Sequence, residues 1–224
     1  MINLRTKAEV KMNYLKVILV MVIAATVGLS AQEKKSETLF SGDIEHGGYG
    51  AVELKYSQVN DGMGLFVGGR GGWIINSTLS IGGGGYGLVT DHVVDGYNPE
   101  DPLIDKAYLR TGYGGLILEY INNSDELVHF TVNALVGAGG AVYTDSWENE
   151  IHHGDNEGHD WNNYENSAYF IFEPGITADL NMFTFMRVSL GASYRFISGL
   201  DLPNTENADL SGASVNLAFK FGKF

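Results

Sequence analysis

The chain has 224 residues, of which 30 are glycine, 4 are proline and none is cysteine. Without cysteine the protein can form no disulfide, no thiolate metal site and no lipid-modified lipoprotein terminus. Its formal net charge of -13 argues against nucleic acid as a partner, because such binding depends on cationic side chains that neutralise phosphates. The length suits one all-β domain preceded by a targeting segment.

The first 31 residues have the features of a secretory signal peptide. Lys11 and Lys16 supply the positive start, residues 17–29 form an apolar core, and small residues follow at 30–31. A single transmembrane anchor is the alternative, but the apolar run is too short to cross a bilayer. We therefore expect a signal peptide at residues 1–31.

The rest of the chain alternates between apolar and polar residues over long segments. In residues 183–196 every second residue from Met186 is apolar, and Arg187 and Arg195 belong to the opposite set. Such alternation places one set of side chains on each face of a β-strand. About ten residues are enough for a tilted strand to cross a bilayer. The mean hydropathy of -0.04 hides this pattern, because apolar and polar residues average out.

Eight segments share the pattern and follow a short periplasmic leader at residues 32–46. We expect strands at residues 47–59, 64–75, 78–90, 107–122, 127–144, 166–180, 183–196 and 210–224. Long polar loops follow the third, fifth and seventh strands, at residues 91–106, 145–165 and 199–209. Turns after the even-numbered strands are short. This asymmetry predicts an all-β fold at residues 47–224, an eight-stranded antiparallel up-and-down transmembrane β-barrel with short periplasmic turns.

Two details of the strands need explanation. Closure of the barrel requires the first and last strands to pair, near residues 52–56 and 215–221, because an open edge in lipid would leave backbone groups unpaired. In the third strand Leu79 and Ile81 share one face, whereas Tyr86 and Leu88 share the other. We therefore expect a β-bulge in the glycine run at residues 82–85 to switch the face.

The chain resembles the small OmpA/OmpX-type outer-membrane barrels in its signal peptide, its eight amphipathic strands and its aromatic end at residues 219–224. The resemblance implies a location in the outer membrane of a Gram-negative bacterium, among lipid and lipopolysaccharide. It also implies that the assembly machinery reads the terminal aromatic residue, which Phe224 matches. Phe224 lies three positions beyond Phe221. Either Phe221 is the last membrane residue, or the strand bulges.

If the apolar faces meet lipid, the opposite faces line the lumen of the barrel. They carry nine charged residues: Glu53, Lys55, Arg70, Glu119, Glu173, Asp179, Arg187, Arg195 and Lys220. Because an unpaired buried charge is costly, we expect Arg187 and Arg195 to contact Glu173, Asp179 or Glu119. An eight-stranded barrel has a bore that side chains can fill. A salt-bridged plug is therefore favoured over an ion path.

The loop at residues 145–165 combines histidines and carboxylates, the ligand types that divalent metals prefer. The candidate ligands are Glu148, Glu150, His152, His153, Asp155, His159 and Asp160. Their spacing matches no closed structural site, so we expect no cofactor beyond loosely bound Ca²⁺ or Mg²⁺. Such cations would relieve repulsion among the acidic outer loops and could bridge them to lipopolysaccharide.

A catalytic site would need a nucleophile beside an oriented base. His129 and Ser189 both lie on predicted inner faces, but His129 is close to the periplasmic start of its strand, away from the outer leaflet. We therefore expect no enzyme. The favoured function is a structural or surface-interaction role through acidic extracellular loops. The alternatives are a narrow, porin-like ion or small-solute conduit, a lipid-modifying enzyme, and a soluble lipocalin-like ligand-binding barrel whose apolar faces point inward.

Overall fold

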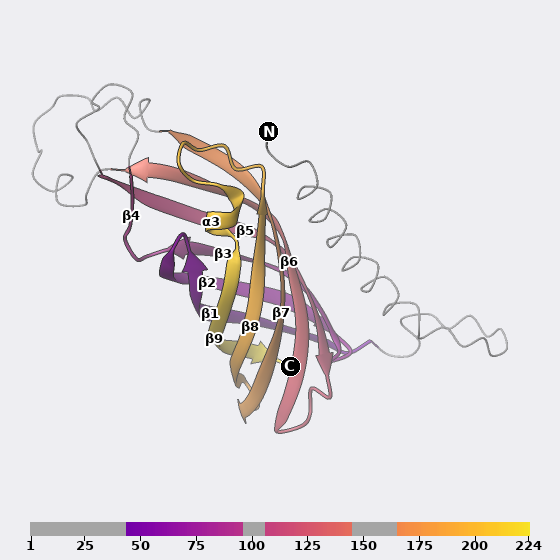
Figure 1. Cartoon of the computed structure of the whole chain (residues 1–224). Helices are drawn as coiled ribbons and strands as arrows, with labels where there is room; N and C mark the ends of the chain where they lie inside the picture. Colours follow the sequence, from indigo (N-terminus) through magenta and orange to yellow (C-terminus); the bar gives the residue numbers. More distant parts are fainter. Residues whose placement is uncertain (1–43, 96–105, 145–164) are drawn as a thin grey trace, which may run out of the picture. The chain divides into compact units, whose positions relative to one another are not determined.

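The computed structural model describes residues 44–95, 106–144 and 165–224, which form one continuous β-sheet with a four-residue helix (Figure 1). The elements in chain order are β1 (His46–Val59), β2 (Gly62–Ile75), β3 (Leu79–Leu88), β4 (His92–Asp95), β5 (Lys106–Asn122), β6 (Val128–Thr144), β7 (Asn166–Phe183), β8 (Met186–Ser198), α3 (Asn207–Leu210) and β9 (Gly212–Lys223). Within these three ranges, no helix has the length and hydropathy that a membrane span requires.

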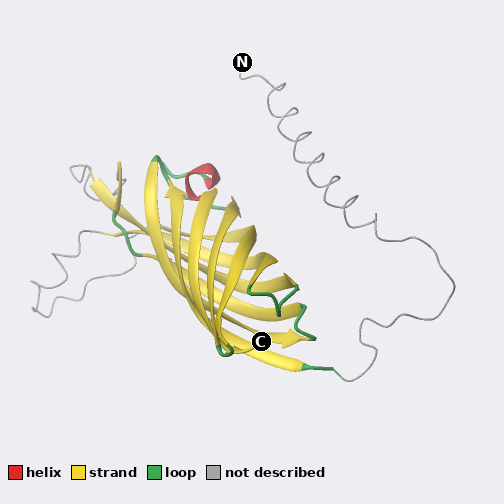
Figure 2. Ribbon diagram, turned by 90° about the horizontal axis from the view of Figure 1, so that it is seen from below, coloured by secondary structure: helices red, strands yellow, loops and turns green. Residues whose placement is uncertain are grey.

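Eight long antiparallel strands close into a barrel, as predicted, and Figure 2 shows them wrapping around a common interior. β1 pairs with β9, with Val52 opposite Phe219 and Tyr56 opposite Val215, so the predicted closure is confirmed. β3 pairs with β5 and completes the ring. The short strand β4 pairs with β5 beyond the end of β3, and the wall itself does not depend on it.

The turns at one end of the barrel are short, as predicted for the periplasmic side. In the β2–β3 turn, Asn76 and Ser77 have φ values of 51° and 52°, the left-handed conformation that both central residues of a type I′ turn require. The amide of Thr78 donates to the carbonyl of Ile75 across this turn, at 3.1 Å. We assign this end to the periplasm and the opposite end to the cell exterior.

The exterior of the barrel is apolar. Leu116 is 71% exposed, Phe170 is 75% exposed, and many aliphatic and aromatic side chains of the wall share this outward orientation. A closed sheet with such an exterior satisfies its backbone hydrogen bonds internally and presents apolar side chains to its surroundings, which is the architecture of a transmembrane barrel. The lipocalin-like alternative is wrong, because it requires these side chains to point inward.

The bulge predicted for β3 is absent from the described strand. β3 pairs with both β2 and β5 in one unbroken register over the glycine run. Ile81 is exposed, whereas Tyr86 and Leu88 are buried, which is the regular alternation of a single strand. The apolar residues change face because the lumen itself becomes apolar toward the extracellular end. A register irregularity lies instead between Asn181 and Phe183, where β7 meets β8.

The ambiguity over Phe224 is also resolved. Phe221 is exposed on the outer face, and β9 keeps its register against β1 and β8. The ring of Phe224 stacks with that of Tyr49, with centroids 6.4 Å apart, at the periplasmic end of the lumen. Phe221 is therefore the last outward aromatic residue, and Phe224 turns inward without a bulge.

Candidate functional site

The lumen is the candidate site, since it holds the polar side chains that the alternating strands direct inward. All nine charged residues that the sequence placed there are buried, with at most 7% of each residue exposed. They come from six strands: β1, β2, β5, β7, β8 and β9. The structure brings seven of them into ion pairs and leaves Arg187 and Arg195 outside those pairs.

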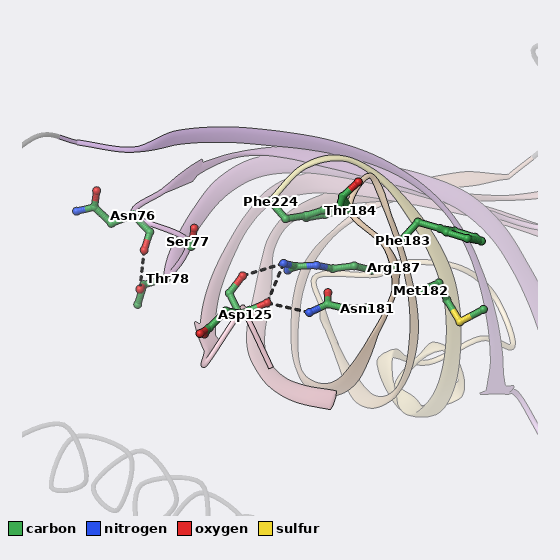
Figure 3. Close-up of a pocket in the computed structure, with 11 residues that line it drawn as sticks. Asn76, Ser77, Thr78, Asp125, Asn181, Met182, Phe183, Thr184, Arg187 and Phe224 are labelled. Atoms are coloured by element: carbon green, nitrogen blue, oxygen red, sulfur yellow. Dashed lines mark hydrogen bonds between the residues drawn. The ribbon is translucent and has the colours of Figure 1, made fainter. Parts of the chain in front are cut away.

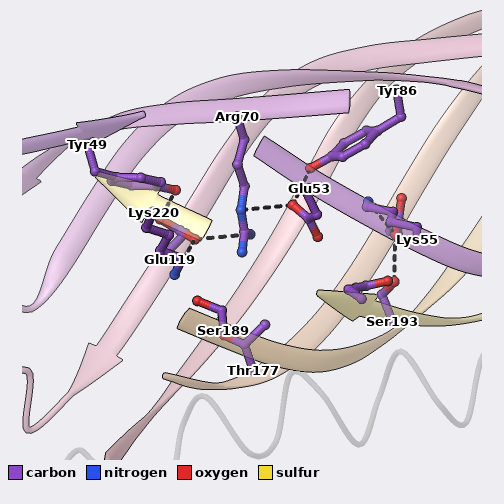
Figure 4. Close-up of polar contacts among 12 residues, drawn as sticks. Tyr49, Glu53, Lys55, Arg70, Tyr86, Glu119, Thr177, Ser189, Ser193 and Lys220 are labelled. Atoms are coloured by element: carbon purple, nitrogen blue, oxygen red, sulfur yellow. Dashed lines mark hydrogen bonds and ion pairs between the residues drawn. The ribbon is translucent and has the colours of Figure 1, made fainter. Parts of the chain in front are cut away.

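Arg70 is the centre of one part of this network (Figure 4). Its Nε lies 3.1 Å from the carboxylate of Glu53, and its Nη1 lies 3.2 Å from that of Glu119. The hydroxyl of Tyr86 donates to Glu53 at 2.8 Å, and that of Tyr49 donates to Glu119 at 2.5 Å. Each carboxylate therefore accepts a hydrogen bond from a tyrosine and forms an ion pair with the arginine, which reduces the cost of its burial.

Asp179 occupies a second part of the network, closer to the periplasmic end. Lys220 lies 3.0 Å from Asp179 and 3.9 Å from Glu119, so it joins this part to the first. The hydroxyl groups of Ser189 and Thr131 also donate to Asp179, Thr131 at 2.6 Å. The carboxylate is thus surrounded by donors from three strands, β6, β8 and β9.

Glu173 is the centre of the third part. Its carboxylate lies 2.8 Å from Lys55 and accepts hydrogen bonds from Tyr113 at 2.8 Å and from Ser193 at 2.6 Å. The ammonium group of Lys55 also lies 3.6 Å from the ring centroid of Tyr86, in cation–π geometry. The tyrosines of the network were not among the predicted site residues, although their inward phase in the alternating strands was a usable signal.

The partners predicted for Arg187 and Arg195 are wrong. Arg195 donates to the backbone carbonyls of Leu210 and Gln58, at 2.6 and 3.0 Å, and lies over the ring of Phe66. Arg187 donates to the carbonyl and hydroxyl of Ser124, at 3.0 and 2.8 Å. Among the described residues, neither guanidinium lies within 4.0 Å of a carboxylate. The lysines and Arg70 occupy the carboxylates, while these two arginines lie at opposite ends of the network.

Above the polar network, the extracellular half of the lumen is filled by an apolar cluster. It includes Phe66, Tyr113, Leu135, Ile171 and Ile197 from the strands. The β8–β9 connection, residues 199–211, adds Leu200, Leu202 and Leu210 to the same cluster, and we call this segment the strap. The hydroxyl of Tyr143 lies 2.5 Å from that of Thr205 and also donates to the carbonyl of Pro203, which fixes the strap at the mouth.

The lumen holds little free space where the network is densest. A cavity lined by Glu53, Lys55, Arg70 and Glu173 has a volume of about 10 Å³. A cavity of that size has room for about one water molecule. The side chains therefore fill the centre of the barrel.

The arrangement offers no nucleophile–base pair at the residues considered from the sequence. His129 is buried, and its Nε2 lies 3.3 Å from the guanidinium of Arg187, while Ser189 donates to Asp179. The predicted metal ligands at residues 148–160 lie outside the described residues. In the part of the chain that the structure does describe, no group of three histidine or carboxylate side chains is arranged to hold a metal ion.

No protein-family model matches the sequence, and no curated protein sequence matches it either. The structure is similar to the crystal structure of Neisserial surface protein A, NspA, with a TM-score of 0.53 and 13% identity over 82% of this chain and 100% of NspA. It also matches the N-terminal β-barrel domain of Pseudomonas aeruginosa OprF, with a TM-score of 0.47 and 9% identity over 80% of this chain and 99% of that domain. Ail of Yersinia pestis, solved with the heparin analogue sucrose octasulfate, gives a TM-score of 0.46 and 14% identity over 80% and 99%.

At these identities the likeness concerns the fold alone. The chain has the fold of the eight-stranded OmpA/OmpX-type outer-membrane barrels, as the resemblance implied. A closed antiparallel sheet with an apolar exterior is the architecture of the barrels that span the outer membrane of Gram-negative bacteria.

Proposed function

We propose that the protein is a non-conducting outer-membrane barrel that acts at the cell surface through its extracellular loops. The filled lumen carries this proposal. Polar side chains pair across its centre, the strap and the apolar cluster fill its extracellular half, and the cavity between Glu53 and Glu173 measures about 10 Å³. A hydrated ion would have to break several of these contacts to pass.

In this proposal the charged side chains of the lumen stabilise the barrel and do not conduct ions. Three cationic side chains, Lys55, Arg70 and Lys220, each contact a carboxylate that also accepts hydrogen bonds from hydroxyl groups. Buried charges persist when such partners compensate for lost hydration. The conduit alternative requires the strap to leave the mouth and the network to separate. The enzyme alternative finds no support at His129 and Ser189, whose hydrogen bonds go to other residues.

If the lumen is closed, the extracellular surface is the part of the protein that can interact with other molecules. Asp61, Asp201 and Glu206 are exposed at the extracellular end, and the long loops of the sequence add further carboxylates. We propose that these groups bind Ca²⁺ or Mg²⁺ loosely at several points and bridge the protein to anionic lipopolysaccharide, because divalent cations relieve repulsion between carboxylates. At the opposite end, Phe221 is the outward aromatic residue that we propose the assembly machinery contacts.

Planar-bilayer recording of the purified full chain tests the closed lumen. We expect no steady unit conductance in the wild-type protein under a moderate applied voltage. Heat-modifiable migration on an unboiled gel, measured on the same preparation, ensures that the barrel is folded. A reproducible ohmic current from folded protein, absent from detergent-only controls, contradicts the proposal and favours the conduit.

A further inference from the structure

The outer face of the barrel at its periplasmic end carries a group of side chains that the proposed function does not use. Inside the barrel at this end, the guanidinium of Arg187 lies 4.0 Å from the ring centroid of Phe224, and both residues line a pocket among the short turns (Figure 3). Lys223 precedes Phe224 and belongs to the opposite, outer face, where it is exposed. Among the described residues, it is the one lysine or arginine on the outer face at this end.

Strand pairing places Lys223 near two aromatic side chains. Gly48 of β1 pairs with Trp73 of β2 on one side and with Lys223 of β9 on the other. Residues directly opposite in antiparallel strands direct their side chains to the same face, so Trp73 and Lys223 flank Gly48 on the outside of the wall. Their Cα atoms are about 10 Å apart, because two strand spacings separate them. The ring of His46 stacks on that of Trp73, with centroids 5.5 Å apart. We call His46, Trp73 and Lys223 the rim cluster.

The rim cluster has open space at its centre and donors that the described residues do not occupy. A Cβ atom added at Gly48 would meet one atom within 4 Å, the backbone oxygen of Gly72 at 3.5 Å. Within the described ranges, no carboxylate lies within 4.0 Å of the ammonium group of Lys223. Trp73 is 51% exposed and His46 is exposed beside it. Indole and imidazole both carry an N–H donor, and the imidazole keeps one in its neutral form.

The level of the rim cluster along the strands matches that of lipid headgroups. Toward the middle of the wall, the same outer face continues with Phe221, Phe219 and Val52, which are 47%, 38% and 57% exposed. Tryptophan and lysine side chains at the end of such an apolar wall lie at the interface between membrane and water. A lipid whose chains contact Phe221 and Val52 therefore has its phosphate near Gly48.

We propose that the rim cluster binds the phosphodiester of an anionic phospholipid in the periplasmic leaflet, with Lys223 as its counter-ion and the N–H groups of Trp73 and His46 as donors. An ammonium group and a phosphate form a charge-assisted hydrogen bond. A zwitterionic lipid brings a cation of its own, which competes with Lys223 for the phosphate, so an anionic lipid is favoured. The exposed Glu45 next to His46 adds a negative charge, which favours a phosphodiester over a doubly charged phosphomonoester.

Quenching of Trp73 fluorescence by brominated lipid tests the proposal. The protein is the full chain with Trp147→Phe and Trp161→Phe, so that Trp73 is its single tryptophan. It is refolded into phosphatidylcholine vesicles that contain a minor fraction of phosphatidylglycerol brominated on its acyl chains. The reference vesicles contain the same fraction of brominated phosphatidylcholine. We expect about fivefold preferential quenching by the phosphatidylglycerol, the effect of one lysine near an anionic lipid. Heat-modifiable gel migration ensures that the barrel is folded.

Three variants of this protein locate the preference at the rim cluster. Lys223→Gln should reduce it to less than about twofold. Lys223→Gln/Leu127→Lys returns the lost charge to the same end of the barrel, at the exposed β5–β6 turn, whose strands do not pair with β1, β2 or β9. It should not restore the preference. Arg110→Gln removes an equal charge at the extracellular end, where Arg110 contacts Asp91, and should leave the preference unchanged.

Equal quenching by the two brominated lipids would overturn the proposal. Full preference in the Lys223→Gln/Leu127→Lys protein would also overturn it, because the attraction would then come from the charge of the whole rim. Inorganic phosphate added at constant ionic strength should leave the quenching unchanged. If it removes the preference, the cluster takes free anions and the assignment to lipid is wrong. None of these outcomes depends on whether the lumen conducts, so the test is independent of the proposed function.

Discussion

Lys55 on β1 and Glu173 on β7 meet across the lumen at 2.8 Å, although their strands are not neighbours in the sheet. The pair therefore spans the bore of the barrel. Arg70 on β2 and Glu119 on β5 form a second contact between strands that do not pair with each other, at 3.2 Å. Both contacts join strands that are not neighbours in the wall, although β2 and β5 are separated only by β3.

Removal of one member of the first pair should destabilise the barrel strongly. Lys55→Met leaves the carboxylate of Glu173 buried and without its cation, so we expect a loss of about 3–5 kcal/mol in the free energy of unfolding. Urea-induced unfolding in detergent micelles measures it. Asp91→Asn, which removes an exposed partner of Arg110, is the control and should cost about 1 kcal/mol or less.

The double variant Lys55→Met/Glu173→Gln separates the loss of the pair from the penalty of the unpaired charge. It should be more stable than Lys55→Met alone, because the remaining side chain is then neutral. The single variant Glu173→Gln completes the comparison. If the double variant loses as much stability as the two single variants together, the carboxylate is already compensated by Tyr113 and Ser193.

An arginine on the lipid face should destabilise the barrel more strongly the closer it lies to the middle of the membrane. Leu190 is 59% exposed near the middle of β8, so Leu190→Arg should cost about 2–4 kcal/mol. Met63→Arg, also outward but beside the extracellular β1–β2 turn, should cost about 1 kcal/mol or less. Refolding into lipid vesicles followed by urea titration measures both. Similar losses at the two positions would contradict the transmembrane placement.

The strap and the polar network should close the lumen independently. The triple variant Leu200→Ser/Leu202→Ser/Leu210→Ser removes the apolar anchors of the strap, yet leaves the contacts of Arg70, Lys55 and Asp179 in place. We expect this variant to lose stability but to remain non-conducting in planar bilayers. A steady current from the folded variant, with none from the wild type, would show that the strap is the principal barrier.

Divalent cations should stabilise the extracellular end. Ca²⁺ at millimolar concentration should raise the midpoint of thermal unfolding more than NaCl of the same ionic strength does, because it binds carboxylate oxygens directly. The intrinsic fluorescence of the two tryptophans of the long 145–165 loop provides a second readout. Asp201→Asn/Glu206→Gln should reduce the effect. If Ca²⁺ and NaCl act alike, the outer carboxylates form only a solvated acidic surface.

The sequence predicted the wall of the barrel well, because the wall depends on a period of two that each strand carries by itself. The inward phase of Glu53, Arg70 and Lys220 followed from their immediate neighbours in the chain. Closure between β1 and β9 followed from the need to pair every edge in lipid. Neither inference required knowledge of distant contacts.

The contacts inside the barrel could not be predicted in the same way. Whether Arg187 meets Asp179 or Ser124 depends on strand tilt and stagger, which set the height of each side chain and which no single strand encodes. The expectation that strand neighbours would pair therefore failed. The strap was missed because its apolar anchors, at Leu200, Leu202 and Leu210, follow no regular period. β4 has four residues, too few for a recognisable alternation.

The contacts across the lumen also constrain the order of assembly. In a sheet whose β1 has not yet joined β9, Lys55 and Glu173 belong to strands far apart, and both side chains need water. The growing barrel must therefore keep a wet interior until its last seam forms. The Lys55–Glu173 pair forms only when that seam closes, so an almost closed barrel lacks its contribution to stability. Completion of the β1–β9 seam should accordingly behave as an all-or-none event.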